Sequence, residues 1–331
     1  MGTKRNKIQQ LVLFKQKQDI VREVEDKPTA IFESVEREDN IKIVYELKPV
    51  GSYYRYSLMI INSSDAPITD IKLNVTFPEF LKIFRCSPIN LVPDNSREEE
   101  NACKVFIDQL NSNSHEQANL YFIPKALNNK GTIRTFVTFV NRDDFVRVLN
   151  SEPLEISIPS ITIEPQIIPS SKINEIYKDS SFKKALVSLG ISIEEQIDYN
   201  IILNHMEMIL KFNQFQLITR DVKNKVIWFF GRIWNKDKVE TSEKFEILVI
   251  CQIVSGKIEF LISCKDAYHL IGVSTILING MIERLMRSEL IESRFQVFRL
   301  DCKNCGVALP SFPKKGEEIT CKACNAQQIV W

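Results

Sequence analysis

Three runs of sequence decide the fold of the central part of the chain: KVIWFFGRIW at 225–234, KFEILVICQI at 244–253 and KIEFLISC at 257–264. A shorter run, Phe215–Arg220, precedes them. Successive residues of a strand point to opposite faces, so each long run has one purely apolar face, such as Ile227, Phe229 and Ile233. Because only short segments separate the runs, we expect a four-stranded antiparallel sheet.

A helical pattern flanks this sheet on each side. The segment SIEEQIDYNIILNHMEMILKF begins at Ser192, which has the spacing of a capping box with Glu195. The segment from Asp266 to Arg287 has apolar residues on one face at helical spacing. Residues 166–288 are therefore predicted to form an α+β domain of helix, four-stranded antiparallel sheet and helix, with both helices on the apolar sheet face.

The opposite face of the predicted sheet is more informative, because a solvated face should be mostly polar. It carries large aromatic and aliphatic side chains beside one arginine: Trp228, Phe230, Arg232, Trp234, Leu248 and Ile250. Trp, Phe and Arg are residue types that anchor partner segments at interfaces. The face is therefore either a peptide-docking surface or a surface that packs against another part of the chain or a second copy.

Residues 28–165 consist of short alternating runs separated by turn residues. Eight of these runs predict strands: Ile41–Lys48, Tyr53–Asn62, Ile68–Phe77, Leu81–Arg85, Ala102–Ile107, Gln117–Phe122, Ile133–Asn141 and Leu154–Ile158. A series of this kind without a helical period predicts an immunoglobulin-like antiparallel β-sandwich. Residues 160–179 are expected to form the joint to the next domain, followed by a short helix at Ser181–Leu189. Residues 1–27 predict a charged helical tail.

The strongest motif is a pair of CxxC knuckles near the C-terminus: Cys302, Cys305, Cys321 and Cys324. Thiolates two residues apart can reach one metal ion from a tight turn, and two such turns complete a tetrahedral four-sulfur shell. Gly306 and Asn325 follow the knuckles, where a positive φ is expected. Residues 294–331 are therefore predicted to form a zinc ribbon around one structural Zn²⁺. Disulfides or an iron site are the alternatives.

The other four cysteines lie within apolar strand patterns: Cys86, Cys103, Cys251 and Cys264. This setting predicts buried, reduced thiols. Together the two groups of cysteines favour a reducing, cytoplasmic location.

Charge and hydropathy narrow the classes of partner. The chain has 43 Lys and Arg against 42 Asp and Glu, a formal net charge of +1, so no strong field draws it to nucleic acid. The sequence contains no run of eighteen apolar residues, so no transmembrane helix is predicted. We therefore expect protein partners, no nucleic acid, and any peripheral recruitment to a membrane through those partners.

The order of these domains resembles a known family. A sandwich with the turn-rich hairpin IINSSDAPITDIKLNVTF (60–77), then a helix, four antiparallel strands and a helix, is similar to the two-lobed appendage (ear) of clathrin-adaptor large subunits, in particular the coatomer gamma subunit. The likeness covers Pro28 to Arg287. It implies a platform that binds short linear motifs at a hydrophobic site, for which Trp228, Phe230, Arg232 and Trp234 are the matching positions.

Two departures weaken the implication of a vesicle-coat role. Family appendages follow a long helical solenoid, which this chain lacks, and they have no C-terminal metal-binding module.

Three functions follow from the sequence. The first is a non-catalytic interaction module that captures peptide motifs in an assembly of the vesicle-trafficking type. The second is a nucleic-acid-associated zinc-ribbon protein, and the third is a purely architectural subunit. An enzyme is not expected, because the sequence has no Gly-rich phosphate loop, HExxH motif or nucleophile elbow. His205 and His269 fall beside apolar residues in helical segments, as structural histidines do.

Overall fold

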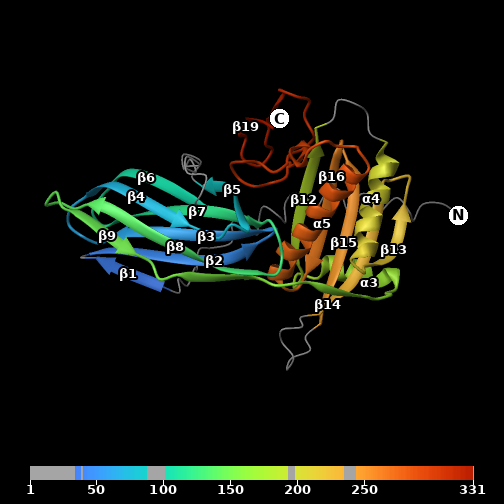
Figure 1. Cartoon of the computed structure of the whole chain (residues 1–331), viewed down its shortest axis with the longest axis horizontal. Helices are drawn as coiled ribbons and strands as arrows, with labels where there is room; N and C mark the ends of the chain where they lie inside the picture. The colour runs from blue at the N-terminus through green and yellow to red at the C-terminus, as the bar shows by residue number, and fades with distance from the viewer. Residues whose placement is uncertain (1–33, 39, 88–100, 193–197, 235–243, 331) are drawn as a thin grey trace.

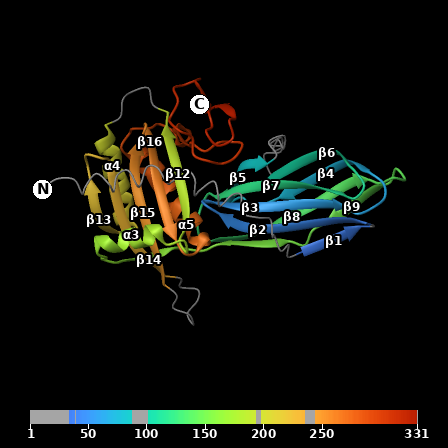
Figure 2. The same cartoon turned by 180° about the vertical axis from the view of Figure 1, so that it is seen from behind.

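The computed structural model describes residues 34–38, 40–87, 101–192, 198–234 and 244–330. The tail predicted over residues 1–27 lies outside the described residues. Figures 1 and 2 show, from opposite sides, a β-sandwich at one end and a sheet with helices at the other. The last strands of the chain lie above the junction of these two parts in both views.

The sandwich consists of two antiparallel sheets. One has the strand order β1-β2-β3-β7-β5, and the other has β10-β8-β4-β6 with β9 also paired to β8. Their bounds are β1 (Ser34–Glu38), β2 (Ile41–Val50), β3 (Tyr53–Asn62), β4 (Ile68–Thr76), β5 (Leu81–Ser87), β6 (Ala102–Leu110), β7 (Ser114–Pro124), β8 (Asn129–Val140), β9 (Val146–Asn150) and β10 (Leu154–Ile158). Strand alternation buries rings such as Tyr45, Phe122 and Phe139 in the core. The predicted antiparallel β-sandwich is confirmed, with β1 and β9 as additional strands.

The mixed domain is built on a seven-stranded antiparallel sheet of order β11-β14-β15-β16-β12-β17, with β13 also paired to β14. Its strands are β11 (Thr162–Pro165), β12 (Lys183–Ile191), β13 (Gln216–Asp221), β14 (Val226–Trp234), β15 (Lys244–Val254), β16 (Lys257–Cys264) and β17 (Val297–Arg299). The four expected strands are present as β13 to β16. Three further strands extend the sheet at its two edges.

Two of these added strands correct the sequence analysis. The helix predicted at Ser181–Leu189 is wrong, because this segment forms β12 between β16 and β17. Pairing on both edges outweighs the helix propensity of its Lys, Ala and Leu residues. The segment Thr162–Pro165, assigned to the end of the sandwich, instead pairs with β14 of the mixed domain.

Helices α4 (Tyr199–Phe212) and α5 (Ala267–Arg287) cover one face of the mixed sheet, in front of it in Figure 1. The first turn of α4 is capped by Asp198, whose side chain accepts a hydrogen bond from the backbone N–H of Asn200. The capping box predicted from Ser192 is therefore not the start of this helix. Among the described residues, no helix is both long and apolar enough to cross a membrane.

The other face of the sheet carries α3 (Ser170–Lys178), which lies in front of the strands in Figure 2. The prolines and serines of this segment are typical of loops and predict a joint between the domains. Pro169 instead precedes the first helical residue, and Ile173 and Ile176 point from α3 into a small core on the sheet.

The two domains pack directly on each other. Ile271 of α5 belongs to the buried core of the sandwich. The side-chain amide of Asn279, further along α5, donates a 3.0 Å hydrogen bond to the backbone carbonyl of Lys125. The ring of Tyr54 lies 6.1 Å from that of Tyr268. Helix α5 therefore serves as a packing element for both domains.

His205, on α4, gives the stability of the mixed domain a dependence on pH. Its ring is buried, and neither ring nitrogen has a hydrogen-bond partner among the described residues. Burial, and then the charge of Arg284, hold the pKa of His205 below its ordinary value. The unfolded chain therefore binds a proton more readily than the folded chain, so stability falls as the pH drops below about 6.5.

We predict that His205→Leu raises the free energy of unfolding at pH 7 by about 1 kcal/mol, because it removes an unsatisfied buried polar group. The loss of stability between pH 7 and pH 5 should also become smaller. Urea unfolding across this range measures both effects, with His115→Gln on the surface of β7 as the control. An unchanged pH profile in His205→Leu would contradict the prediction.

Candidate metal centre and the adjoining cavity

Two turns of the same construction carry the four C-terminal cysteines. In the first turn, the backbone N–H of Gly306 donates a 2.8 Å hydrogen bond to the carbonyl of Cys302. In the second turn, the backbone N–H of Asn325 donates a 2.9 Å hydrogen bond to the carbonyl of Cys321. Gly306 has a φ of 76° and Asn325 a φ of 57°, so the expected positive φ is confirmed at both positions. The hairpin of β18 (Glu318–Thr320) and β19 (Gln327–Ile329) brings the second turn back to the first.

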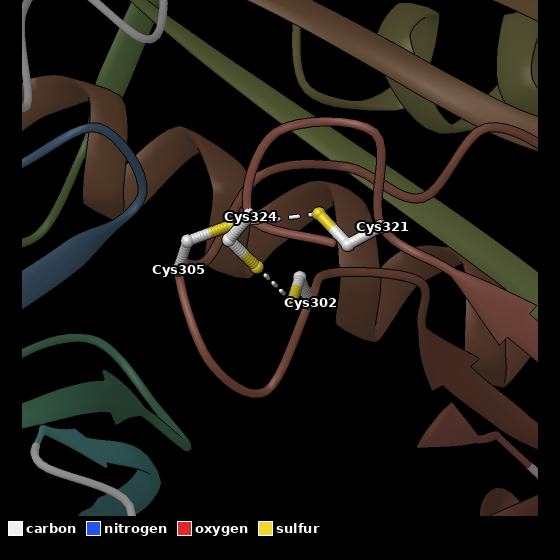
Figure 3. Close-up of side chains that lie close together, drawn as sticks. All are labelled: Cys302, Cys305, Cys321 and Cys324. Atoms are coloured by element: carbon white, nitrogen blue, oxygen red, sulfur yellow. Dashed lines mark hydrogen bonds between the residues drawn. The ribbon is translucent and has the colours of Figure 1, made fainter. Parts of the chain in front are cut away.

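The four sulfur atoms form one cluster. Figure 3 shows the four side chains pointing toward one another from the two turns. All four Sγ atoms lie within 4.8 Å of one another, and the pairs Cys302–Cys324 and Cys305–Cys321 are 3.6 Å apart. A disulfide requires about 2.05 Å, whereas tetrahedral ligands 2.3 Å from a zinc ion lie about 3.8 Å apart. The donor set therefore fits a four-coordinate metal ion and contains no disulfide.

The thiols of this cluster differ in acidity. Burial raises the pKa of Cys302 and of Cys305. Burial also opposes ionisation of Cys324, but hydrogen bonds from the backbone of Ala326 and from the neighbouring thiols outweigh it and lower the pKa to about 7. The cluster thus contains one thiol that ionises near neutral pH, the form in which cysteine binds metals.

The remaining cysteines lie in the two large cores: Cys86, Cys103, Cys251 and Cys264. All four are buried and free, as expected.

A buried polar cluster joins the C-terminal module (residues 294–330) to the sandwich. The guanidinium of Arg299 forms a 2.8 Å ion pair with Asp301 and donates a 2.6 Å hydrogen bond to Ser52. The Tyr53 hydroxyl donates to the same Asp301 carboxylate, and burial raises the pKa of Tyr53 well above its usual range. Arg299 also lies 4.3 Å over the Tyr53 ring. These contacts attach the β2–β3 turn to the residues just before the first knuckle.

Arg85 makes a second contact between the sandwich and the first knuckle. Its guanidinium lies 3.5 Å over the ring of Tyr121 and donates a 3.1 Å hydrogen bond to the carbonyl of Asn304. A Cβ at Gly306 would lie 2.8 Å from Nε of Arg85. Gly306 is therefore required both for the positive φ of the knuckle and for the close approach of Arg85.

The C-terminal module also contacts the mixed domain. β17 pairs with β12 and so continues the sheet. The buried Lys257 amine donates a 2.7 Å hydrogen bond to the carbonyl of Leu309 and forms a 2.7 Å ion pair with Glu259. The Phe312 ring packs against Gly190, where a Cβ would lie 2.8 Å from it. The module is thus held between the two larger domains.

A cavity of about 380 Å³ remains where the three parts meet. Its floor is the face of the mixed sheet that α3 covers elsewhere, where Gln252, Lys257 and Glu259 line the cavity. The β2–β3 turn and Arg85 form one wall, and residues 305–310 with Lys322 form another. A volume of this size lies near the lower end of the range for small-molecule sites, about 300–1,000 Å³.

The structure corrects the prediction of an exposed docking face on the mixed sheet. Phe230, Leu248 and Ile250 are buried in a core with residues of α3, and Trp228 packs half-buried at its edge. Arg232 is half-buried, and Trp234, at the end of β14, is 38% exposed. The expectation that this face packs against another part of the chain is therefore correct for its centre, because α3 covers it.

Several residues of the metal-centre region could not be predicted from the sequence. Ser52 and Tyr53 lie 247 and 248 residues before their partners Arg299 and Asp301, so no local pattern links them. Glu259 could have been noticed in the sequence, because it is a carboxylate between the apolar residues Ile258 and Phe260 of a predicted strand. A buried ion pair with a neighbouring lysine is the usual way to place such a group.

Comparisons with known proteins identify no family. No protein-family model and no curated protein matches the sequence. Among solved structures, the major pilin subunit of Bacillus cereus aligns with 66% of this chain at 11% identity and a TM-score of 0.28. A GH20 exo-β-N-acetylglucosaminidase from Vibrio harveyi aligns with 68% at 11% identity and a TM-score of 0.26. The matched regions span 59% and 40% of those two chains, and similarity this low carries no argument about function.

Proposed function

We propose that this chain is a non-catalytic protein-interaction module that binds peptide segments of partner proteins, in the manner of adaptor and coatomer appendages. Its partners would belong to an intracellular assembly of the vesicle-trafficking type. The observation that carries the proposal is a set of large apolar side chains exposed on the sandwich, away from every domain contact described above.

These side chains form the outer apolar face, defined by Phe106 on β6, Phe136 on β8, and Val146 and Val148 on β9, each of which is exposed on the side of its strand that faces away from the sandwich core. The strand register places Phe106 beside Lys72, Lys72 beside Thr138, and Thr138 beside Val148, so one row crosses four strands. Phe106 is 62% exposed, Val146 69% and Val148 49%. Exposed apolar groups gathered on one sheet face are typical of protein-binding surfaces. A row of this kind, with Phe106 and Val148 at its ends, could hold an extended segment with apolar side chains.

The metal centre has a structural role in this proposal. We assign its ion as Zn²⁺, because four thiolates at tetrahedral spacing are the usual donor set of structural zinc sites. Four protein ligands leave no open position for a substrate, so the ion would supply folding free energy and no chemistry. The thiolates require a reducing compartment, which favours the cytoplasm.

A peptide display library tests the proposal. The zinc-loaded full chain is used to select from random peptides, and the affinity of enriched peptides is measured by fluorescence anisotropy. We expect enriched peptides to be rich in large apolar residues and to bind the Phe106→Ser/Val148→Ser double variant at least tenfold more weakly. Both side chains are exposed, so the melting temperature should change little.

Phe212→Ser is the matched control, because Phe212 is 78% exposed on α4 and lies outside this face. Its variant should bind the peptides as the wild type does. Failure to enrich peptides, or equal binding by the double variant, would contradict the proposal. A salt-sensitive shift with DNA or RNA would instead support the nucleic-acid alternative.

A further inference from the structure

The cavity between the three parts of the chain has an excess of positive charge. Four cationic side chains line it, namely Arg85, Lys184, Lys257 and Lys322, against the single carboxylate of Glu259. Glu259 is already paired with Lys257 at 2.7 Å. Among the described residues, no carboxylate lies within ion-pair distance of Arg85, Lys184 or Lys322. The chain as a whole is nearly neutral, so this local excess is a property of the cavity.

The cavity also has a built polar floor. Under α3 the same sheet face is apolar, but under the cavity it carries the buried residues Gln252, Lys257 and Glu259. The Gln252 amide donates a 2.7 Å hydrogen bond to Glu259, which fixes both side chains. The walls include apolar groups such as Val254 and Val307. Fixed polar groups beside apolar walls are the usual composition of a small-molecule site.

A loaded metal centre changes this charge but does not cancel it. Zn²⁺ with four thiolates carries two net negative charges, and Cys305 contributes one of the thiolates to the cavity wall. When the two negative charges of the cluster and the carboxylate of Glu259 are set against the four cationic side chains, a net charge of +1 remains around the cavity. Arg85 and Lys322 are next to the knuckles and offset the thiolates. Lys184, on β12, lines the cavity; its amine lies 4.7 Å over the ring of Tyr177, and it forms no ion pair with a carboxylate of the described residues.

We propose that this cavity binds a small organic anion with an apolar body, whose acid group is held by Lys184. A carboxylate and a phosphate monoester share this chemistry. This site is separate from the outer apolar face, and either can fail without the other.

Isothermal titration calorimetry with the zinc-loaded full chain tests the site. The probes are 1-naphthoate and 1-naphthyl phosphate, with uncharged 1-naphthol as the reference. We expect one molecule of an anionic probe to bind per chain, about tenfold more tightly than 1-naphthol and less tightly as salt is added. Comparison of the two anions shows which acid group the site prefers.

Two variants test whether the anion binds in this cavity. Lys184→Gln should weaken anion binding about fivefold, whereas Lys183→Gln, the exposed neighbour on the same strand, should leave it unchanged. Val254→Trp should abolish binding by filling the cavity, with circular dichroism and melting temperature confirming that the variant folds. The proposal is overturned by the absence of saturable binding, by equal binding of 1-naphthol, or by equal effects of the two lysine variants.

Discussion

Removal of the metal, by chelation or by Cys321→Ser, is expected to unfold the C-terminal module while the cores of the sandwich and the mixed domain stay folded. The buried core of the module consists of Cys302, Leu309, Ile319 and Cys321, so two of its members belong to the candidate metal centre. Metal binding supplies about 10–16 kcal/mol in zinc-finger peptides, and a core this small cannot replace it.

Hydrogen exchange measures the extent of this unfolding. Amides of β17, β18 and β19 should lose protection, and protection should also fall in the β2–β3 turn, because Ser52 and Tyr53 lose Arg299 and Asp301. Ala323→Ser, in the same knuckle but not a ligand, should behave as the wild type. Full protection of residues 297–330 after chelation would contradict the assignment, and global unfolding would show that the domains depend on the module for their stability.

Phe230→Ala is expected to destabilise the mixed domain by about 3–5 kcal/mol, the usual cost of removing a buried Phe side chain. Phe230 is fully buried between the sheet and α3. Trp234→Ala, at the exposed end of the same strand, should cost less than about 1 kcal/mol. Urea unfolding followed by circular dichroism compares the two variants without relying on tryptophan fluorescence.

This comparison distinguishes a covered sheet face from an open one. If Phe230→Ala were as stable as the wild type, α3 would not cover the sheet in solution, and the face would be available to a partner. Similar large losses in both variants would show that Trp234 is more deeply packed than its exposure indicates.

The strands of the central sheet could be predicted because the alternation of residues along each of them shows which side chains share a face. In β14 the large apolar residues Ile227, Phe229 and Ile233 share one face, and in β16 Ile258, Phe260 and Ile262 do, so both segments have the period of a strand and not of a helix. The helix predicted at Ser181–Leu189 is wrong because the Lys, Ala and Leu residues of this segment favour a helix locally. The segment is a strand because Lys183–Leu189 pair with β16 and Leu189–Ile191 pair with β17, and β17 lies about a hundred residues later in the chain.

The cover of the docking face could not be predicted for a similar reason. Helix α3 has only nine residues, follows Pro169 and presents two buried isoleucines, Ile173 and Ile176, which is too short a pattern to identify a helix. The knuckles were predictable because only two residues separate the cysteines of each pair. Their attachment to Ser52, Tyr53 and Arg85 depends on contacts across more than two hundred residues.

The pairing of β17 with β12 has a consequence for synthesis of the protein. A ribosome makes the chain from its N-terminus, so β12 emerges long before residues 297–299 exist. Until residues 297–299 have been made, the nascent mixed sheet therefore has an open strand border at Leu189–Ile191, the kind of border that neighbouring polypeptides can join. A premature stop codon just before β17 would leave that border open permanently.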